Sequence, residues 1–447
     1  MERHGKAIII GGGISGKLAA RVMSDFFMEI VILERDPEPD GPFPRKGARQ
    51  GEHLHALLHA GENGLEELFP GITGKFHQSG ALKINSTKDL AWFHHGVWKL
   101  RFDGGYSTTL QTRPHLEWHI EQYIKAIPNV SIFYNQSVGN YLYNKEQNRI
   151  TGVQVKETTN TTKNFTADLI VDASGAGSFS TGWLKELGIT IPHHKVEIGL
   201  SYVSQLFHLP DNVSRDWKIK LLYPTPPHEK IGGTISKVEG ERYIVTIMGY
   251  QHEIYEKEVL ENDNGFLALT RRLPKLDIYH EIKDGTPLSK PSIYRVPFIL
   301  WKRFDKLKEL PDGLLLIGDT VCRIDPVFGQ GMSLAVLEAL TLQKLLRESN
   351  NPLQKTISIF HKNVSKIISP IWNMVVTEDF RYHSISGKKP LGLRLQQWYA
   401  KNIFLLSAKD ETVLNAFIKV MNLVKPITIL MQPKILLKVI AKSFSNK

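Results

Sequence analysis

The sequence predicts an α/β fold in which a domain built on a parallel sheet is interleaved along the chain with a domain built on an antiparallel sheet, followed by a helical C-terminal region. Three observations lead to this prediction. Apolar runs that end in a small-residue turn and continue as a helix pattern occur near residues 6–26, 168–187 and 314–346. Alternating apolar and polar runs fill residues 197–250, and the pattern after Arg347 is helical to the end.

The first of these turns has the glycine spacing of a dinucleotide site. The apolar run at 6–10 leads into Gly11, Gly13 and Gly16, then into a helix pattern, and a second strand pattern at 29–33 ends in Glu34. Glycines spaced as G-x-G-x-x-G permit a tight turn, let the backbone approach a pyrophosphate, and let the helix pack closely on the strand. Glu34 follows about twenty residues on, where a carboxylate can hold a ribose hydroxyl. This segment predicts a Rossmann-like unit that binds a dinucleotide.

The residues between the first and second turns predict mixed structure. Residues 37–52 are rich in proline, glycine and charge, which predicts an exposed loop, and residues 53–68 are predicted to form a helix. That helix would carry three histidines near its start, but no Cys or Asp ligand accompanies them, so no metal site is predicted. Short aromatic-rich strands at 80–106, a helix at 115–126 and a hairpin that pairs 150–156 with 164–167 follow.

The second turn follows a buried strand pattern at 169–171, which ends at Asp172 and continues with small residues around Gly175. If this strand lies parallel to the first one, the two turns face each other, because ligands bind at the carboxyl ends of such strands. Asp172 has two interpretations: it contacts the same ligand, or it only caps its own turn.

The third turn follows the apolar run at 314–317. The run stops at Gly318 and Asp319, an irregular segment follows, and a helix pattern continues to about Leu346. The first turn of that helix has free N–H groups and partial positive charge, which suits a ligand that gains negative charge. Asp319 is placed to accept hydrogen bonds from an extended polyol, with simple capping of the helix as the alternative.

Length and composition bound the possibilities. A chain of 447 residues predicts two or three packed units. Cys322 is the only cysteine, which excludes an internal disulfide and fits a reducing compartment. The first residues lack an apolar secretory core, and no apolar run is long enough to span a bilayer, so a cytoplasmic location is expected. Aromatic or groove-reading motifs are lacking beside the basic residues, so no nucleic-acid partner is expected.

The net charge of +11 is concentrated in the C-terminal segment. Residues 388–447 contain eleven basic residues against Asp410 and Glu411, a net charge of +9. Lys434, Lys438 and Lys442 recur every four residues on an otherwise apolar helix pattern. Such a helix could lie on an anionic membrane surface as a peripheral anchor, or it could pack its apolar face on the protein with the lysines in water.

Taken together, the three turns resemble the FAD-dependent monooxygenases of the p-hydroxybenzoate hydroxylase and squalene epoxidase type. The segments that resemble more narrowly a bacterial subgroup including polyether epoxidases are QGEHLHALL at 50–58, DASGAGS at 172–178 and DTVCRIDPVFGQGMS at 319–333. The resemblance covers roughly residues 1–345. It implies a discontinuous FAD-binding domain (1–75, 107–190 and 296–347), an antiparallel substrate domain (76–106 and 191–295) and a C-terminal helical region (348–447).

The resemblance also implies roles for particular residues. Gly11 to Gly16 would hold the FAD pyrophosphate, Glu34 the adenosine ribose and Asp319 the ribityl chain, while the loop 326–332 would lie along the isoalloxazine ring. Arg113 falls where this family often places an Arg or Gln against the cofactor, and Arg45 lies in the mobile loop near the flavin. The implied cofactor contacts are Gly11, Gly13, Ile14, Ser15, Gly16, Glu34, Arg35, Arg45, Arg113, Asp172, Gly175, Gly318, Asp319, Pro326, Gly329, Gly331 and Met332. The expected cavity walls for the substrate are Trp92, Phe102, Tyr202, Tyr250 and Phe328.

The implied chemistry is that of a monooxygenase. NADPH or NADH, used directly or through a partner reductase, would reduce the flavin, and O₂ would form a flavin C4a-hydroperoxide that epoxidises or hydroxylates a bulky apolar substrate such as a terpenoid or polyketide. No catalytic acid or base is assigned. Two alternatives remain: a flavin-dependent reductase of isoprenoid double bonds, and a non-catalytic flavin-binding protein of the membrane surface. A halogenase is disfavoured because a Trp-x-Trp-x-Ile-Pro segment is lacking.

Overall fold

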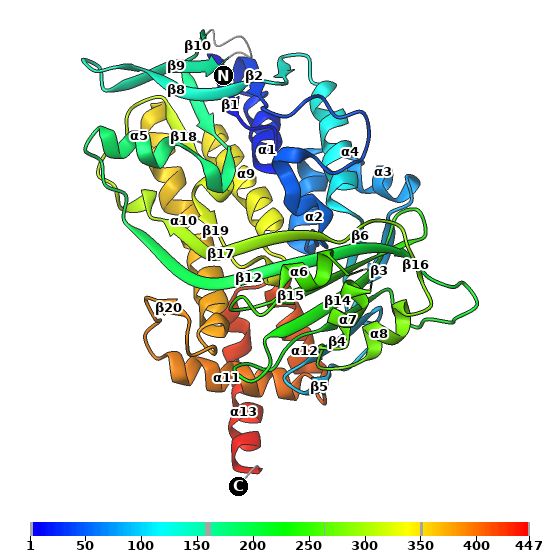
Figure 1. Cartoon of the computed structure of the whole chain (residues 1–447). Coiled ribbons are helices and arrows are strands. Elements are labelled where there is room, and N and C mark those ends of the chain that lie inside the picture. The colour runs from blue at the N-terminus through cyan, green and yellow to red at the C-terminus, as the bar shows by residue number, and fades with distance from the viewer. Residues whose placement is uncertain (1–2, 157–161, 263, 349–351, 446–447) are drawn as a thin grey trace.

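The computed structural model describes residues 3–156, 162–262, 264–348 and 352–445. Its elements form a parallel sheet with flanking helices, a larger antiparallel sheet across the middle of the molecule, and a helical region at the opposite end (Figure 1). This arrangement confirms the predicted α/β fold with interleaved sheets and a helical C-terminal region.

The parallel sheet brings the three predicted turns together. Its strand order is β18 (Leu314–Leu316), β11 (Leu169–Asp172), β1 (His4–Ile10), β2 (Phe27–Leu33) and β7 (Val130–Phe133), and all neighbours are parallel. Ile10 pairs with Asp172, and Asp172 pairs with Leu316, so the turns after β1, β11 and β18 leave the same edge of the sheet. The prediction that the turns face each other is confirmed by this register.

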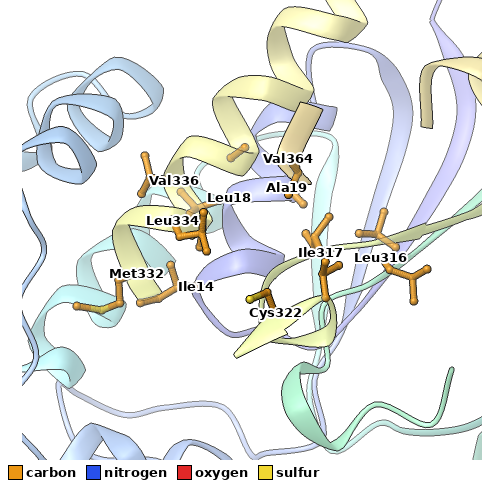
Figure 2. Packing of buried hydrophobic residues seen from close by; sticks show 14 of the residues in the cluster. Ile14, Leu18, Ala19, Leu316, Ile317, Cys322, Met332, Leu334, Val336 and Val364 are labelled. Carbon is orange, nitrogen blue, oxygen red and sulfur yellow. The ribbon is translucent and has the colours of Figure 1, made fainter. Parts of the chain in front are cut away.

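Three helices pack together beside this sheet. Helix α1 (Ile14–Met23) lies against α9 (Gly331–Glu348) and α4 (Arg113–Lys125). Figure 2 shows Leu18 of α1 beside Leu334 of α9, with Ile317 and Cys322 in the same apolar cluster. Cys322 is buried, and burial raises the pKa of its thiol well above the ordinary value.

A small three-stranded antiparallel sheet packs beside strand β11 of the parallel sheet. Strand β9 (Arg149–Lys156) pairs with β8 (Ser137–Asn144) and with β10 (Thr162–Thr166), both antiparallel. Asn164 pairs with Gln154, which confirms the predicted pairing of the two runs. Strand β3 (Leu82–Asn85) pairs with β6 (Ser107–Leu110) in a separate ribbon.

The large sheet matches the predicted antiparallel unit, except for one parallel pair between β13 (Ile219–Leu222) and β4 (Leu90–His94). Its strand order is β19 (Cys322–Arg323), β17 (Ser292–Lys302), β12 (His193–His208), β15 (Arg242–Gly249), β14 (Ile231–Val238), β13 (Ile219–Leu222), β4 (Leu90–His94) and β5 (Val97–Trp98), with β16 (Thr286–Pro287) and β20 (Ser386–Gly387) also paired to β12. The short helices α6 (Glu256–Leu260), α7 (Gly265–Thr270) and α8 (Asp277–Ile282) follow β15. The predicted domain boundary between residues 295 and 296 falls inside β17, which belongs to this sheet over its whole length.

The prediction of a helix over residues 53–68 is only partly right. Helix α2 spans His59–Leu68 and is followed by α3 (Ile72–Gln78), whereas residues 53–58 are not helical. The ring of His53 hydrogen-bonds Ser204 Oγ at 2.7 Å, and the backbone N–H of Leu54 donates to Thr246 Oγ1 at 3.1 Å. These bonds tie the segment to the large sheet, and tertiary contacts of this kind override a local helix pattern. The predicted exposed loop likewise contains a 3₁₀ turn, Lys46–Glu52, with Ala48 and Gly51 buried.

The C-terminal region consists of α10 (Leu353–Asp379), α11 (Leu393–Leu406), α12 (Glu411–Met421) and α13 (Pro433–Ser445), interrupted by β20. Helix α13 lies at the end of the molecule farthest from the parallel sheet (Figure 1). It buries Ile435 and Val439 while Leu437 is 66% exposed, so its apolar residues divide between the protein and its surroundings. Among the described residues, no helix combines the length and apolar character needed to cross a membrane.

Candidate active site

The turn after β1 forms a backbone cradle. Gly11 has a φ of +98°, which glycine adopts readily, and a Cβ on Gly16 would lie 1.9 Å from the Gly11 carbonyl oxygen. A Cβ on Gly13 would meet no atom within 4 Å, because Gly13 borders an open cavity. Helix α1 begins directly after Gly13 without a side-chain cap. Its free N–H groups and positive dipole end form a site for a phosphate group.

Glu34 lies beside this cradle at the end of β2. Its Oε2 atom accepts from the backbone N–H of Gly12 at 2.7 Å, and its Oε1 atom accepts from the N–H of Asp36 at 2.9 Å. Arg45 bonds Glu34 at 3.3 Å and Glu117 at 2.6 Å. Burial would lower the pKa of Arg45, but Glu117 and Glu34 hold it above its ordinary value. The structure thus places Arg45 in a charge cluster next to Glu34, at the predicted ribose position, rather than in a free loop near the flavin.

The carboxylates of the second and third turns have different surroundings. Asp172 is fully buried, and its two oxygens accept hydrogen bonds from the N–H and hydroxyl of Ser174 and from the hydroxyls of Ser178 and Ser180. It therefore holds its own turn and does not border the cavity, so its predicted cofactor contact is not supported. Asp319 does border the cavity, near Gly175. Burial raises the pKa of Asp319 above its ordinary value, and the positive charges of Arg113 and Arg323 offset part of this rise.

Gly318 and Gly16 do not line the cavity but allow close packing in the turns that form its wall. Gly318 has a φ of +64°, and a Cβ there would lie 2.3 Å from Ser15 Oγ. Its N–H donates to Oε2 of Glu338 on α9 at 2.7 Å. Glu338 is 2% exposed, and burial together with the nearby charge of Asp319 raises its pKa from 4.5 to about 7. These glycines shape the backbone of two turns without lining the cavity.

We call the space enclosed by these turns the dinucleotide cavity. It has a volume of about 390 Å³ and is bordered by all three turns. The predicted cofactor residues that line it are Gly11, Gly13, Ile14, Ser15, Glu34, Arg35, Arg45, Arg113, Gly175, Asp319, Pro326, Gly329, Gly331 and Met332. Sequence reasoning missed others that line it, of which Arg323 lies inside the third quoted segment and His55 inside the first, while Tyr294 had no signal.

The residues of the dinucleotide cavity fit a flavin dinucleotide. A Cβ at Gly13, Gly177 or Gly331 would meet nothing within 4 Å, so open space lies against the backbone at all three turns. No side-chain hydrogen bond occupies the Asp319 carboxylate within the described residues, which leaves it free for ligand hydroxyls. Arg113 and Arg323 supply positive charge near it.

A second space, which we call the large cavity, lies between the large sheet and the C-terminal helices. Its volume is about 1370 Å³, and its walls are mainly apolar. Trp92, Tyr250 and Phe328 line it as predicted, whereas Tyr202 lines the dinucleotide cavity. Phe102 lines neither of these two cavities and packs against the apolar cluster of the C-terminal helices, so its predicted substrate contact is not supported.

The loop 326–332 borders both cavities. Its Val327 and Phe328 line the large cavity, while Pro326, Gly329, Gly331 and Met332 line the dinucleotide cavity. The hydroxyl of Tyr223 donates to the Val327 carbonyl at 2.9 Å and so fastens the loop to the large sheet. A ligand in one cavity is therefore separated from a ligand in the other by a single loop.

Three potential metal ligands converge beside the large cavity. His94, His95 and Glu378 bring their ligand atoms within 4.8 Å of one another, the one such group among the described residues. Burial lowers the pKa of both histidines. However, Arg381 donates to both oxygens of Glu378, at 2.7 and 2.9 Å. Its positive charge satisfies the carboxylate and opposes a second cation, so this group is better described as a buried ion-pair cluster.

Comparisons with known proteins agree with this site. The model of the family described as FAD binding domain matches residues 5–351. Protein Rv3254 of Mycobacterium tuberculosis (strain ATCC 25618 / H37Rv) is 26% identical over 426 residues, which cover 91% of this chain and 87% of that protein.

Solved structures share the fold. The p-nitrophenol 4-monooxygenase PnpA from Pseudomonas putida DLL-E4 superposes with a TM-score of 0.68 at 16% identity, covering 96% of this chain and 100% of that chain. The probable FAD-dependent monooxygenase pqsL from Pseudomonas aeruginosa gives a TM-score of 0.64 at 15% identity, covering 85% and 96%. The flavin-dependent halogenase CmlS gives 0.66 at 15% identity, covering 93% and 67%. At these identities the likeness concerns the fold.

Proposed function

Because the chain belongs to the FAD-binding domain family, we propose that it is an FAD-dependent monooxygenase that acts on a bulky, largely apolar substrate. The observation that carries this proposal is the large apolar cavity, which is separated from the dinucleotide cavity by the loop 326–332. Bound FAD supplies the redox chemistry with O₂, and NADPH or NADH supplies the electrons.

The residues of this chain would bind and orient the cofactor. The cradle at Gly11 and Gly13 with the start of α1 suits the pyrophosphate, Glu34 the ribose, and Asp319 the hydroxyls of the polyol. The loop 326–332 would form the floor against the ring system. Its glycines, Gly329 and Gly331, leave space for a flat ligand against the backbone.

The large cavity would hold the substrate and exclude water. Trp92, Tyr250 and Phe328 contribute aromatic walls, and the apolar surroundings suit a long hydrocarbon chain or a fused ring system such as a terpenoid or polyketide. Excluding water at this position would prevent activated oxygen from being lost as peroxide before it reaches the substrate. Epoxidation and hydroxylation of such a substrate are both compatible with this arrangement.

The experiment that tests this proposal measures oxygen consumption by the FAD-loaded protein. We expect flavin absorbance in the purified protein, reduction of the flavin by NADPH or NADH, and oxygen uptake that rises when apolar alkenes are added and yields oxygenated product. Product formation under strict exclusion of oxygen would instead support the alternative of a flavin-dependent double-bond reductase. Halide-dependent product formation would support a halogenase, a class that the shared fold alone does not exclude.

We propose further that the C-terminal end of the molecule contacts an anionic membrane surface. The large cavity is bordered there by Trp398, Met431, Leu436 and Ile440, which are all exposed, and the adjoining segment carries the net charge of +9. Apolar burial and attraction of lysines by anionic lipid would both contribute. This surface would give an apolar substrate a route from lipid to the cavity.

Vesicle sedimentation tests the membrane contact. We expect the Leu437→Glu variant, which places a charge on a side chain that is 66% exposed, to weaken binding to vesicles rich in phosphatidylserine. The matched control is Leu276→Glu on an exposed leucine near α8, which should bind as the unmodified protein does. Equal binding by both variants, or no binding by the unmodified protein, would contradict the proposal. Full turnover after deletion of residues 430–447 would exclude a purely membrane-surface role.

A further inference from the structure

The large cavity has a polar end made of two buried carboxyl groups. Asp379, the last residue of α10, is 2% exposed and borders the cavity. Asp325 is fully buried and comes directly before the loop 326–332. The side chains of these two residues are hydrogen-bonded to each other, and no function described so far uses them.

A hydrogen bond between two carboxyl groups requires a proton on one of them. Asp325 accepts from the backbone N–H of Val327 at 2.9 Å and from the hydroxyl of Tyr250 at 2.8 Å, so it is the better stabilised as an anion. Among the described residues Asp379 has no such donors, and burial and the neighbouring Asp325 raise its pKa well above the ordinary value. Asp379 is therefore the carboxyl that holds the proton and donates it to Asp325.

A protonated carboxyl that donates in one direction still has a free acceptor. The side chain of Asp379 borders the cavity, and it accepts no hydrogen bond from an N–H or hydroxyl group of the described residues. An unmet acceptor in an apolar cavity is costly, and a ligand that donates a hydrogen bond there would remove the cost.

We propose that the Asp325–Asp379 pair binds a hydroxyl group at one end of the apolar substrate. This inference rests on the proposed function of the large cavity and adds the polar group that its substrate carries. The pair holds one negative charge, which disfavours a carboxylate ligand in these apolar surroundings. Asp325 adjoins the loop that borders the dinucleotide cavity, so binding at the pair would fix which end of the substrate lies near the cofactor.

Binding of three probes that share a twelve-carbon chain to the FAD-loaded protein tests the inference. The probes are 1-dodecanol, its methyl ether and dodecanoate, and the readout is the change in tryptophan fluorescence, because Trp92 and Trp398 line the cavity. The alcohol donates a hydrogen bond, the ether only accepts, and dodecanoate is charged. We expect the alcohol to bind about tenfold more tightly than the ether, the effect of one satisfied buried acceptor.

Variants at Asp379 separate recognition from a structural role. Asp379→Asn keeps one donor for Asp325 and one acceptor for the ligand, so it should retain the preference for the alcohol. Asp379→Leu removes both and should bind alcohol and ether equally. Asp305→Asn is the control on the wall of the same cavity, where Arg303 already bonds the carboxylate at 2.7 Å, and it should leave the preference unchanged. Circular dichroism verifies that each variant is folded. If Asp379→Leu does not fold, the comparison rests on Asp379→Asn alone.

The outcomes are distinct. A preference for the alcohol that survives Asp379→Asn supports the inference. Equal affinity of the unmodified protein for alcohol and ether, tighter binding of dodecanoate, or loss of the preference in Asp379→Asn overturns the inference and leaves the proposed monooxygenase untouched. Failure of all three probes to bind overturns the proposed role of the large cavity, and this inference with it.

Discussion

Replacement of Glu338 by glutamine should change how the stability of the protein depends on pH. Glu338 is buried in α9 and accepts one hydrogen bond from the Gly318 N–H, while its other oxygen, Oε1, has no partner among the described residues. Glutamine has the same shape and can keep the bond to Gly318 through its carbonyl oxygen. It removes only the charge that the buried carboxyl acquires on ionisation.

The magnitude follows from the raised pKa. The pKa of Glu338 lies at about 7 in the folded protein, against an ordinary value of 4.5. A shift of one unit corresponds to about 1.4 kcal/mol, so ionisation destabilises the folded state by at most about 3.5 kcal/mol. The folded protein holds this proton more tightly than the unfolded chain does. The cost is therefore absent below about pH 4.5, grows as the pH rises to about 7, and stays constant above that.

Urea denaturation at two pH values measures the effect. We expect the difference in unfolding free energy between Glu338→Gln and the unmodified protein to be larger at pH 8 than at pH 5, by about 2 to 3 kcal/mol, with FAD saturating in both. Glu348→Gln, at the exposed end of the same helix, is the control and should show no such change. A difference for Glu338→Gln that is equal at the two pH values would refute the reasoning.

Four further substitutions test the site and the core. Gly13→Ala should fold normally but lose FAD, measured by flavin absorbance and calorimetry, because its Cβ would enter the cavity, whereas Gly16→Ala should lower the melting temperature because its Cβ would collide with backbone. Asp319→Ala should reduce FAD occupancy by about tenfold or more, and a variant with full flavin content would contradict the assigned role. Lys17→Met should destabilise the protein by about 1 to 3 kcal/mol in denaturant titrations, because buried Glu121 would lose its bond to Lys17 at 2.8 Å and keep only those from Tyr134 at 2.7 Å and Lys125 at 3.3 Å.

The convergence of the three turns could be predicted because each turn follows from a local pattern. Each of the three turns combines an apolar run, small residues and a helix start, and the register of β1, β11 and β18 places them at one edge. What sequence could not distinguish is the direction of a side chain after such a strand. Asp172 and Asp319 follow the same pattern. The hydroxyls of Ser178 and Ser180 bond the carboxylate of Asp172, whereas the carboxylate of Asp319 faces the cavity.

Contacts between distant segments account for the rest. The start of the predicted helix at His53 is wrong because Ser204 and Thr246 of the large sheet bond the segment in a non-helical form. The Asp325–Asp379 pair joins a loop to the end of a long helix; Asp325 lies in the third quoted segment, but Asp379 lies outside all three, and no pattern in the sequence links the two residues. Such sites depend on how the domains pack, and periodicity within one segment does not contain that information.

Because Cys322 is buried, the native protein should not react with thiol-specific reagents. Reaction with maleimides or iodoacetamides requires an accessible thiolate, and this thiol is both enclosed and held in its protonated form. A cysteine introduced at Leu437 would therefore be the sole reactive thiol in the native chain without any prior removal of Cys322. A fluorophore or spin label attached there could report directly on the immersion depth of α13 in lipid.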